Sequence, residues 1–152
     1  MDPDMIAIAP LSPNDFADWL PLWQRYLAFY QAQVPEETTS LSFARLAGGE
    51  EPMGGFIARD DHGHAVGIVH WIAHRSCWTS GDYCYLQDLF VEAEQRGRGV
   101  GRQLIETVYA LAKTRHCSRV YWLTHETNTS AMALYDKIAT KSGFLQYVHK
   151  LI

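Results

Sequence analysis

Residues 95–101, with the sequence QRGRGVG, combine three glycines with two arginines in one short stretch. They follow an aromatic and β-branched run, Tyr83–Val91, that predicts a strand, and they precede apolar residues at helical spacing from Val100 to about Arg115. A loop between a strand and a helix N-terminus presents unpaired backbone N–H groups and the positive end of the helix dipole to one point. Glycine permits the unusual backbone conformations of a tight loop and lets a phosphate approach the main chain. The stretch therefore predicts a phosphate site.

Two common nucleotide-binding loops do not fit this stretch. The dinucleotide fingerprint G-x-G-x-x-G needs a glycine where this chain has Arg102, and the P-loop ends in G-K-[ST], whereas no lysine occurs between Gly81 and Leu111. An RGG-type nucleic-acid segment is repetitive and disordered, but this stretch is a single copy between a strand and a periodic helix. A surface turn that is simply rich in glycine remains the alternative to a phosphate site.

Residues 96–101 resemble the R-x-x-G-x-G acyl-CoA-binding motif of the GNAT superfamily of N-acetyltransferases, and they occupy the same place between a strand and a helix. A second motif resembles the N-x-x-A-x-x-L-Y…G-F segment of that family, with a few residues inserted before the Gly-Phe pair; its matching residues are Asn128, Ala131, Leu134 and Tyr135. The resemblance covers about residues 83–147. It implies an acetyl-CoA-dependent N-acetyltransferase of the small branch that acetylates polyamines, histone-like lysines or free amino acids.

The resemblance also implies which residues bind acetyl-CoA. The arm of the cofactor would pair with backbone groups of Leu89, Phe90 and Val91, where the family has a β-bulge that leaves such groups available. A backbone N–H there would bind the acetyl carbonyl oxygen as an oxyanion hole. Asn128 would contact the cofactor, although asparagine is also a common helix cap. The pyrophosphate would be held by the backbone N–H groups of Arg96, Gly97, Arg98, Gly99, Val100 and Gly101.

Tyr135 matches the usual general acid of the family, which protonates the leaving thiolate. The ordinary pKa of tyrosine is ~10 and that of a thiol is ~8.5, so the proton transfer is uphill by about 2 kcal/mol before the site adjusts either group. This chemistry is feasible. On periodicity alone, Tyr135 is also compatible with a core aromatic residue of an amphipathic helix.

An amine with a lysine-like pKa of ~10.4 must lose a proton before it attacks a thioester. The sequence YLQDLFV resembles a strand of spermidine/spermine N-acetyltransferases in which a Glu-Asp pair occupies the positions of Gln87 and Asp88. The glutamate is the base there, whereas Gln87 cannot accept a proton. Asp88 is the predicted catalytic carboxylate, acting through water or binding a cationic amine, and a buried hydrogen-bond partner is the alternative. Other candidate bases are His70, His74, His125 and Glu126.

The acceptor pocket of the family is built mainly by the first two helices. Aromatic residues beside carboxylates suit a cation with a hydrocarbon body, such as a polyamine or an amino acid derivative. A bound metal is not expected, because the pairs His62/His64 and His70/His74 have no third ligand nearby in sequence. The residues that predict the acceptor pocket are Trp19, Trp23, Tyr26, Phe29, Tyr30, Glu36 and Glu37.

The elements that must position these residues form a mixed α/β pattern. The predicted order is strand, two helices, three strands, helix, strand, helix and strand, and residues 83–125 form a β-loop-α-β unit with parallel strands. The predicted fold is therefore a single GNAT-like α/β domain, residues 1–152, with a central, mostly antiparallel sheet, one parallel strand pair splayed at the cofactor site, and helices on both faces. The predicted ranges are strands at 6–9, 83–91, 119–125 and 144–151, a hairpin within 54–76, and helices at 14–30, 41–46, 100–115 and 130–141.

The composition narrows the function classes. The chain has 152 residues and a net charge of −4, which argues mildly against nucleic-acid binding, and no apolar run approaches the ~20 residues that span a bilayer. An acidic start where a secretory signal would be basic, and three widely spaced cysteines, predict a cytoplasmic protein with reduced thiols. The last predicted strand lacks the return strand usual in a GNAT sheet. Because an unpaired edge invites a partner, we expect a homodimer whose C-terminal edges meet or exchange.

The sequence is also compatible with two other functions. A non-catalytic acyl-CoA-binding or sensor domain is compatible with Gln87, which removes the obvious base. A nucleic-acid-binding RGRG protein would bind oligonucleotides with a strong salt dependence and would not bind coenzyme A. Turnover of acetyl-CoA with amines distinguishes an acetyltransferase from both of these alternatives.

Overall fold

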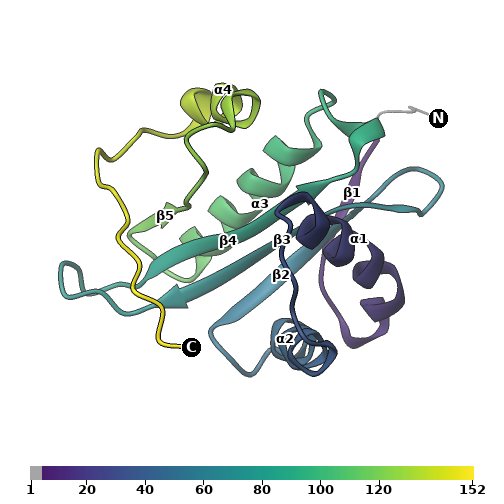
Figure 1. Ribbon diagram of the computed structural model, residues 1–152, viewed down its shortest axis with the longest axis horizontal. Coiled ribbons are helices and arrows are strands. Elements are labelled where there is room, and N and C mark those ends of the chain that lie inside the picture. The colour runs from purple at the N-terminus through teal and green to yellow at the C-terminus, as the bar shows by residue number, and fades with distance from the viewer. Residues whose placement is uncertain (1–4) are drawn as a thin grey trace. The chain divides into compact units, whose positions relative to one another are not determined.

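The computed structural model describes residues 5–152, so Asp2 and Asp4 of the acidic start lie outside the described residues. The chain forms two compact units, Met1–Trp122 and Leu123–Ile152. In chain order, the first unit contains β1 (Ala7–Pro10), a 3-10 turn (Pro13–Asp15), α1 (Phe16–Phe29), α2 (Glu36–Gly48), β2 (Met53–Arg59), β3 (Ala65–His74), β4 (Tyr83–Val91), a second 3-10 turn (Ala93–Gln95), α3 (Val100–Thr114) and β5 (Arg119–Tyr121) (Figure 1). The second unit contains α4 (Thr129–Ile138).

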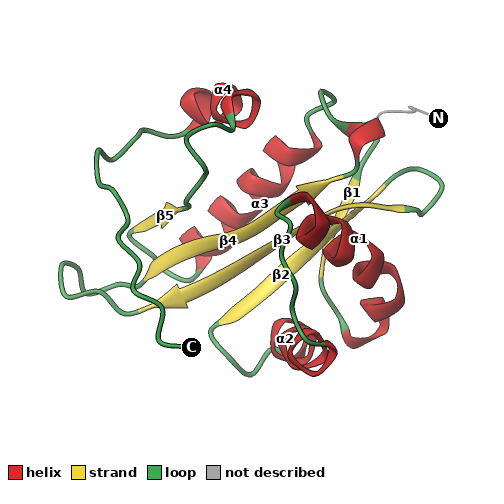
Figure 2. Ribbon diagram, viewed as in Figure 1, coloured by secondary structure: helices red, strands yellow, loops and turns green. Residues whose placement is uncertain are grey.

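The strands of the first unit form one sheet in the order β1-β2-β3-β4-β5 (Figure 2). Neighbouring strands are antiparallel from β1 to β4, and β4 and β5 are parallel. The parallel pair follows from α3, because a helix between two strands returns the chain to the end where the first strand began. The predicted mixed sheet with one parallel pair is confirmed.

The two faces of the sheet carry different helices, as the alternation of side chains along β3 shows. A Cβ added at Gly67 would lie 3.1 Å from the Leu104 side chain of α3. On the opposite face, His70 accepts a hydrogen bond from Trp19 of α1. Phe43 of α2 packs against Trp19 as well, with ring centroids 4.9 Å apart. Helices therefore cover both faces, as predicted.

The helices have the apolar spacing that this packing requires. α1 buries Trp19 and Leu22 completely against the sheet, and α2 adds Phe43 and Leu46 to the same core. α3 covers the other face with residues that recur at helical spacing and are almost inaccessible to solvent: Val100, Leu104, Ile105, Val108 and Ala112. Burial of each valine, leucine or isoleucine side chain among them stabilises the fold by roughly 1.5–3 kcal/mol.

Some predicted boundaries are wrong. α2 begins at Glu36 rather than residue 41. Pro35 stands at its N-cap, and Glu36 and Glu37 lie in its first turn, where the helix dipole favours negative charge. The strand predicted at 119–125 ends at Tyr121, and the helix predicted to reach residue 141 ends at Ile138.

The strand predicted at 144–151 is not formed. Residues 139–152 contain no strand, and their large apolar side chains are exposed. An isolated β-run has no partner for its backbone hydrogen bonds, so sequence pattern alone does not make it a strand. The exposed side chains are Phe144, Leu145, Tyr147, Val148, Leu151 and Ile152.

Among residues 5–152, every helix is too short or too polar to cross a bilayer.

Candidate active site

A β-bulge in β4 lies at Gln87. His70 of β3 pairs with Asp88 and Trp71 pairs with Leu86, so Gln87 has no partner in the ladder. The bulge is thus earlier than the predicted position at 89–91, and that expectation is corrected. Residues three apart in a regular strand point to opposite faces, but the extra residue at the bulge brings the Asp88 side chain to the same face as Tyr85.

β4 has an open edge beyond the bulge. Its pairing with β5 covers only Tyr83 to Tyr85, so in the described part of the chain β4 runs on from Leu86 to Val91 with no strand on that side. The Glu92 N–H donates to the Val66 oxygen at 2.9 Å, and hydrogen-bonded pairs alternate along an antiparallel ladder. The backbone groups of Leu89 and Val91 therefore face the open edge. They belong to two of the three residues predicted to pair with the cofactor arm.

The Arg96 guanidinium lies beside the end of β4. Its Nε donates to the Val91 carbonyl oxygen at 3.1 Å, and its guanidinium lies over the rings of Phe90 and Phe29 at 5.8 and 6.0 Å from their centroids. Cation–π contacts of this kind fix a cation without neutralising it. The Val91 oxygen has two lone pairs, so it can still accept a further hydrogen bond from a ligand.

The glycine loop has the backbone conformation that an anion cradle needs. Gly97 and Gly99 have φ values of 82° and 83°, in the left-handed region that favours glycine, and no atom lies within 4 Å of a Cβ added at either position. Gly99 is the N-cap of α3, and no side chain caps this helix. The Gln103 N–H donates to the Gly99 oxygen at 3.0 Å. The N–H groups of the first turn before Gln103 have no acceptor within the helix, so the donor set fits a pyrophosphate.

Arg102 contributes less positive charge to the loop than its sequence position indicates. Its Nε donates to Glu106 Oε1 at 2.8 Å, one turn along α3. The carboxylate offsets the charge of the guanidinium. The positive character of the loop therefore comes from the helix end and from the arginines before it.

A buried hydrogen-bond chain connects α1 to the bulge. The Trp19 Nε1–H donates to His70 Nε2 at 3.0 Å, and His70 Nδ1 lies 2.9 Å from Asp88 Oδ2. The Tyr26 hydroxyl donates to Asp88 Oδ1 at 2.8 Å. Both oxygens of the carboxylate therefore have a partner on the protein. Because each carboxylate oxygen has two lone pairs, Asp88 can still accept from a further donor.

The partners of His70 define its tautomer. An indole N–H only donates, so His70 Nε2 must accept and the ring proton lies on Nδ1, where it donates to Asp88. His70 is 3% exposed, and a second proton on Nε2 would break the hydrogen bond from Trp19. Of the predicted candidate bases, His70 is therefore unsuited to accept a proton.

Tyr26 stays protonated beside the carboxylate. Burial, followed by the charge and the hydrogen bond of Asp88, raises the pKa of Tyr26 far above the ordinary value. A neutral hydroxyl is the form that donates to a carboxylate. Tyr26 is predicted from the sequence to line an acceptor pocket, but its bond to Asp88 is not predicted, because a contact between residues 62 positions apart leaves no local pattern.

Further tyrosines continue the same face of the sheet away from Asp88. The ring of Tyr85 stacks on that of Tyr121, with centroids 5.0 Å apart and planes inclined by 17°. His74 Nε2 lies 2.7 Å from the Tyr121 hydroxyl oxygen. Burial, with Asp88 and Tyr121 next, raises the pKa of Tyr85. This face therefore presents aromatic rings and hydroxyl groups next to one carboxylate.

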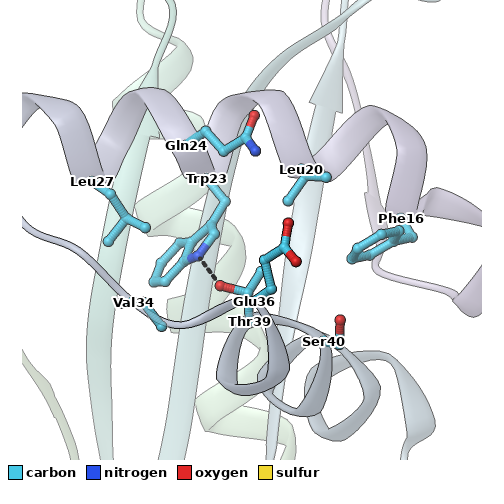
Figure 3. A pocket seen from close by; sticks show the side chains of 9 residues that line it. All are labelled: Phe16, Leu20, Trp23, Gln24, Leu27, Val34, Glu36, Thr39 and Ser40. Atoms are coloured by element: carbon cyan, nitrogen blue, oxygen red, sulfur yellow. Dashed lines mark hydrogen bonds between the residues drawn. The ribbon is translucent and has the colours of Figure 1, made fainter.

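A separate cavity of about 340 Å³ lies between α1 and α2 (Figure 3). Trp23 forms part of its wall and donates from Nε1 to Thr39 Oγ1 at 3.3 Å, the dashed line in Figure 3. Glu36 points its carboxylate into the same space. Of the residues predicted for the acceptor pocket, only Trp23 and Glu36 line this cavity. Trp19 and Tyr26 face the sheet instead.

The second unit carries the remaining predicted residues. Asn128 stands at the N-cap of α4, but its side chain makes no cap hydrogen bond, so the capping role is not observed. Tyr135 lies inside α4, and its carbonyl oxygen accepts from the Ala139 N–H at 2.8 Å. His125 Nδ1 accepts from the Thr127 N–H at 3.2 Å. The cofactor and catalytic roles of Asn128 and Tyr135 stay predictions.

Comparison with known proteins gives one family. The model of the acetyltransferase (GNAT) family matches residues 18–139. The chain is 34% identical over 145 residues to the D-amino-acid N-acetyltransferase HPA3 of Saccharomyces cerevisiae, a match that covers 95% of this chain and 90% of the relative. It is 33% identical over 66 residues to a thialysine N-epsilon-acetyltransferase of Sus scrofa, covering 43% of this chain and 38% of that protein.

Solved structures show the same fold at low sequence identity. A ribosomal-protein-alanine N-acetyltransferase from Brucella melitensis biovar Abortus 2308 is 23% identical with a TM-score of 0.79, covering 97% of this chain and 100% of the other. An aminoglycoside N-acetyltransferase in complex with CoA is 18% identical with a TM-score of 0.83, covering 97% of this chain and 96% of the other.

Proposed function

This chain belongs to the acetyltransferase (GNAT) family and is an acyltransferase, and from this premise we propose that it transfers an acetyl group from acetyl-CoA to a primary amine. The amine attacks directly in a ternary complex, without a covalent enzyme intermediate. The proposal covers residues 1–152 as one catalytic domain.

The observation that carries the proposal is the continuity between the open edge of β4 and the glycine loop. Leu89 and Val91 face the open edge, and the uncapped N-terminus of α3 follows within a few residues of the same chain. A ligand with an amide-containing arm and a pyrophosphate needs this order of sites, because strand-like donors and acceptors hold the arm and free N–H groups hold the phosphates. Coenzyme A has both parts.

The proposed chemistry needs two proton transfers. The amine nitrogen forms a bond to the thioester carbon, and the carbon–sulfur bond then breaks, so the amine loses a proton and the thiolate gains one. A backbone N–H at the open edge, such as that of Leu89, would stabilise the oxyanion between these steps, and one such donor contributes about 3–4 kcal/mol in other enzymes. Tyr135 is the proposed proton donor to the thiolate.

Asp88 supports a cationic acceptor. Its carboxylate is 15% exposed and held by Tyr26 and His70, so its position is fixed before an amine binds. The tyrosine rings beside it add faces that attract cations. We propose an amino acid, lysine-like amine or polyamine as acceptor. The names of the yeast and pig relatives, a D-amino-acid and a thialysine acetyltransferase, support the first two classes.

The exposed apolar side chains of residues 144–152 support a homodimer. Apolar side chains of this number on one short segment are unusual on a free surface and mark an interface. We propose that the segment pairs with, or exchanges into, a second copy of the chain in the cytoplasm.

The experiment is a panel assay of thiol release from acetyl-CoA with spermidine, lysine, thialysine and D-alanine. We expect release that depends on one of the amines, together with the N-acetylated product by mass spectrometry. Tyr135→Phe should lower kcat by about 10²-fold or more, since general acid catalysis contributes 10²–10⁴-fold. Tight binding of acetyl-CoA without turnover of any amine would contradict the proposal and favour the sensor alternative.

A further inference from the structure

His74 and Tyr121 form a hydrogen-bonded pair where β4 and β5 separate. Tyr121 is the last residue of β5 and pairs with Tyr85, after which β4 continues alone. His74 ends β3 opposite Tyr83. Because His70, His74 and the tyrosines occupy alternate positions in register, their side chains share the face that carries Asp88. The pair therefore belongs to the same surface as the candidate catalytic carboxylate.

The partners of His74 show that its Nε2 is available to a proton. His74 Nδ1 lies 2.8 Å from the Arg75 carbonyl oxygen, which only accepts, so the ring proton lies on Nδ1. Nε2 therefore has a lone pair and accepts from the Tyr121 hydroxyl at 2.7 Å. A proton on Nε2 would only reverse this hydrogen bond, because a hydroxyl oxygen accepts as well as donates.

His74 differs from His70 in both respects that matter for a base. Nε2 of His70 is held by a group that only donates, and its ring is buried. The ring of His74 is exposed, so a proton taken up there can leave to water. His70 and His74 therefore differ in role, and of the two only His74 can accept a proton.

A path joins the pair to the carboxylate. Tyr121 stacks on Tyr85, and Tyr85 and Asp88 interact electrostatically across the bulge. Three residues of strand span about 10 Å, and a bulge shortens that span. An amine bound by Asp88 and the Tyr121 hydroxyl would therefore lie on the same face, on either side of Tyr85, and water molecules would have to bridge them.

We propose that Tyr121 and His74 accept the proton that the acceptor amine loses, in place of the carboxylate that Gln87 cannot supply. The inference rests on the proposed acetyl transfer. The ammonium N–H passes its proton through bridging water to Tyr121 Oη while the hydroxyl proton of Tyr121 moves to His74 Nε2. The neutral amine then attacks the thioester carbon and the carbon–sulfur bond breaks; the second proton that the nitrogen loses balances the one that the thiolate gains, and the imidazolium of His74 releases the first proton to water.

The charged and titratable groups around His74 in the first unit are few. Its ring centroid lies 5.8 Å from that of Tyr83 on β4 and 5.7 Å from that of Tyr121 on β5. The Arg119 guanidinium lies 4.2 Å from the centre of the Tyr83 ring. In the loop after β3, Arg75 Nη1 lies 3.5 Å from Asp82 Oδ1.

The test is the pH dependence of kcat/KM for lysine, spermidine and D-alanine. In the wild-type protein, activity should fall at acidic pH, because a proton already on His74 Nε2 leaves no lone pair there to accept the one from Tyr121. His74→Gln and Tyr121→Phe should lose about 10²-fold or more at neutral pH and should lose this acidic limb. Their defect should shrink as the pH approaches the pKa of the amine, because the amine then arrives neutral. Free imidazole should restore part of the activity of His74→Ala.

His62→Gln is the matched control, because His62 is another exposed histidine, in the turn between β2 and β3. It should keep the wild-type profile. The proton-accepting role of His74 and Tyr121 would be overturned if kcat/KM of His74→Gln fell by the same factor at every pH, or by less than about 3-fold. An acidic limb that survives the substitution would overturn this role as well. A wild-type protein that acetylates none of the amines would instead overturn the proposed transfer, and the pair with it.

Discussion

Alanine in place of Gly99 should weaken coenzyme A binding, whereas alanine at a comparable glycine far from the loop should not. Gly99 has a φ of 83°, and an L-residue in the left-handed region is disfavoured by about 1–2 kcal/mol relative to glycine. If the loop relaxes to relieve this strain, the N–H groups at the start of α3 no longer converge. A change of one or two kcal/mol in the binding free energy corresponds to a factor of roughly 5–30 in Kd. The added Cβ also projects into the open space at the loop, where a phosphate would approach.

Gly63→Ala is the matched control for Gly99→Ala. Gly63 has a φ of 82°, and no atom lies within 4 Å of a Cβ added there, but it lies in the turn between β2 and β3. Both variants should lose about 1–2 kcal/mol of stability. For a chain of this length the melting temperature should then fall by roughly 2–8 °C.

The assay is isothermal titration calorimetry with coenzyme A, beside thermal melts of both variants. We expect Kd to rise 5-fold or more in Gly99→Ala and to stay unchanged in Gly63→Ala, because only the backbone strain at position 99 lies at the binding site. Wild-type affinity in Gly99→Ala would refute the assignment of the loop as a pyrophosphate cradle. Equal losses of affinity in the two variants would refute it too, because the effect would then come from general stability.

Three further predictions concern other parts of the molecule. Tyr26→Phe removes a hydrogen bond to a carboxylate worth about 1.5–3 kcal/mol, so it should raise KM for the amine and leave KM for acetyl-CoA unchanged. A rise in both constants would contradict this role of Tyr26. Because the folded-state pKa of Tyr26 is raised, its contribution to stability is complete below the unfolded value of about 10 and is lost as the pH rises above it. Melts between about pH 9 and 11 should therefore lose stability less steeply in Tyr26→Phe than in the wild type, and equal slopes would contradict the assignment. Phe144→Ser should shift the mass measured by light scattering toward the monomer, and a wild-type monomer at micromolar concentration would exclude the dimer.

Local pattern predicted the elements that carry their own signal. β4 and α3 were predicted almost to the residue, because an aromatic and β-branched run ends at a glycine loop and a strongly amphipathic helix follows it. The left-handed residues Gly97 and Gly99 agree with the conformational argument for glycine in that loop. These features depend on neighbours in the chain, which a sequence displays directly.

Features that depend on distant partners were missed. The bulge at Gln87 is set by the register against β3, and the tautomer of His70 is set by Trp19, 51 positions away. The strand predicted from residue 144 fails for the same reason, because a β-run becomes a strand only beside a partner. The proposed role of Tyr121 depends on its place at the end of β5, whereas the sequence predicts that strand to continue for four more residues.

The central claim is transfer of acetyl from acetyl-CoA to an amine, and its most direct measurement is the stoichiometry of the two products. Purified protein with acetyl-CoA and the amine panel should release one coenzyme A for each N-acetylated amine, with no release when the amine is left out. Coenzyme A released without any N-acetylated amine, or acetyl-CoA bound and left intact in the presence of every amine, would contradict the account.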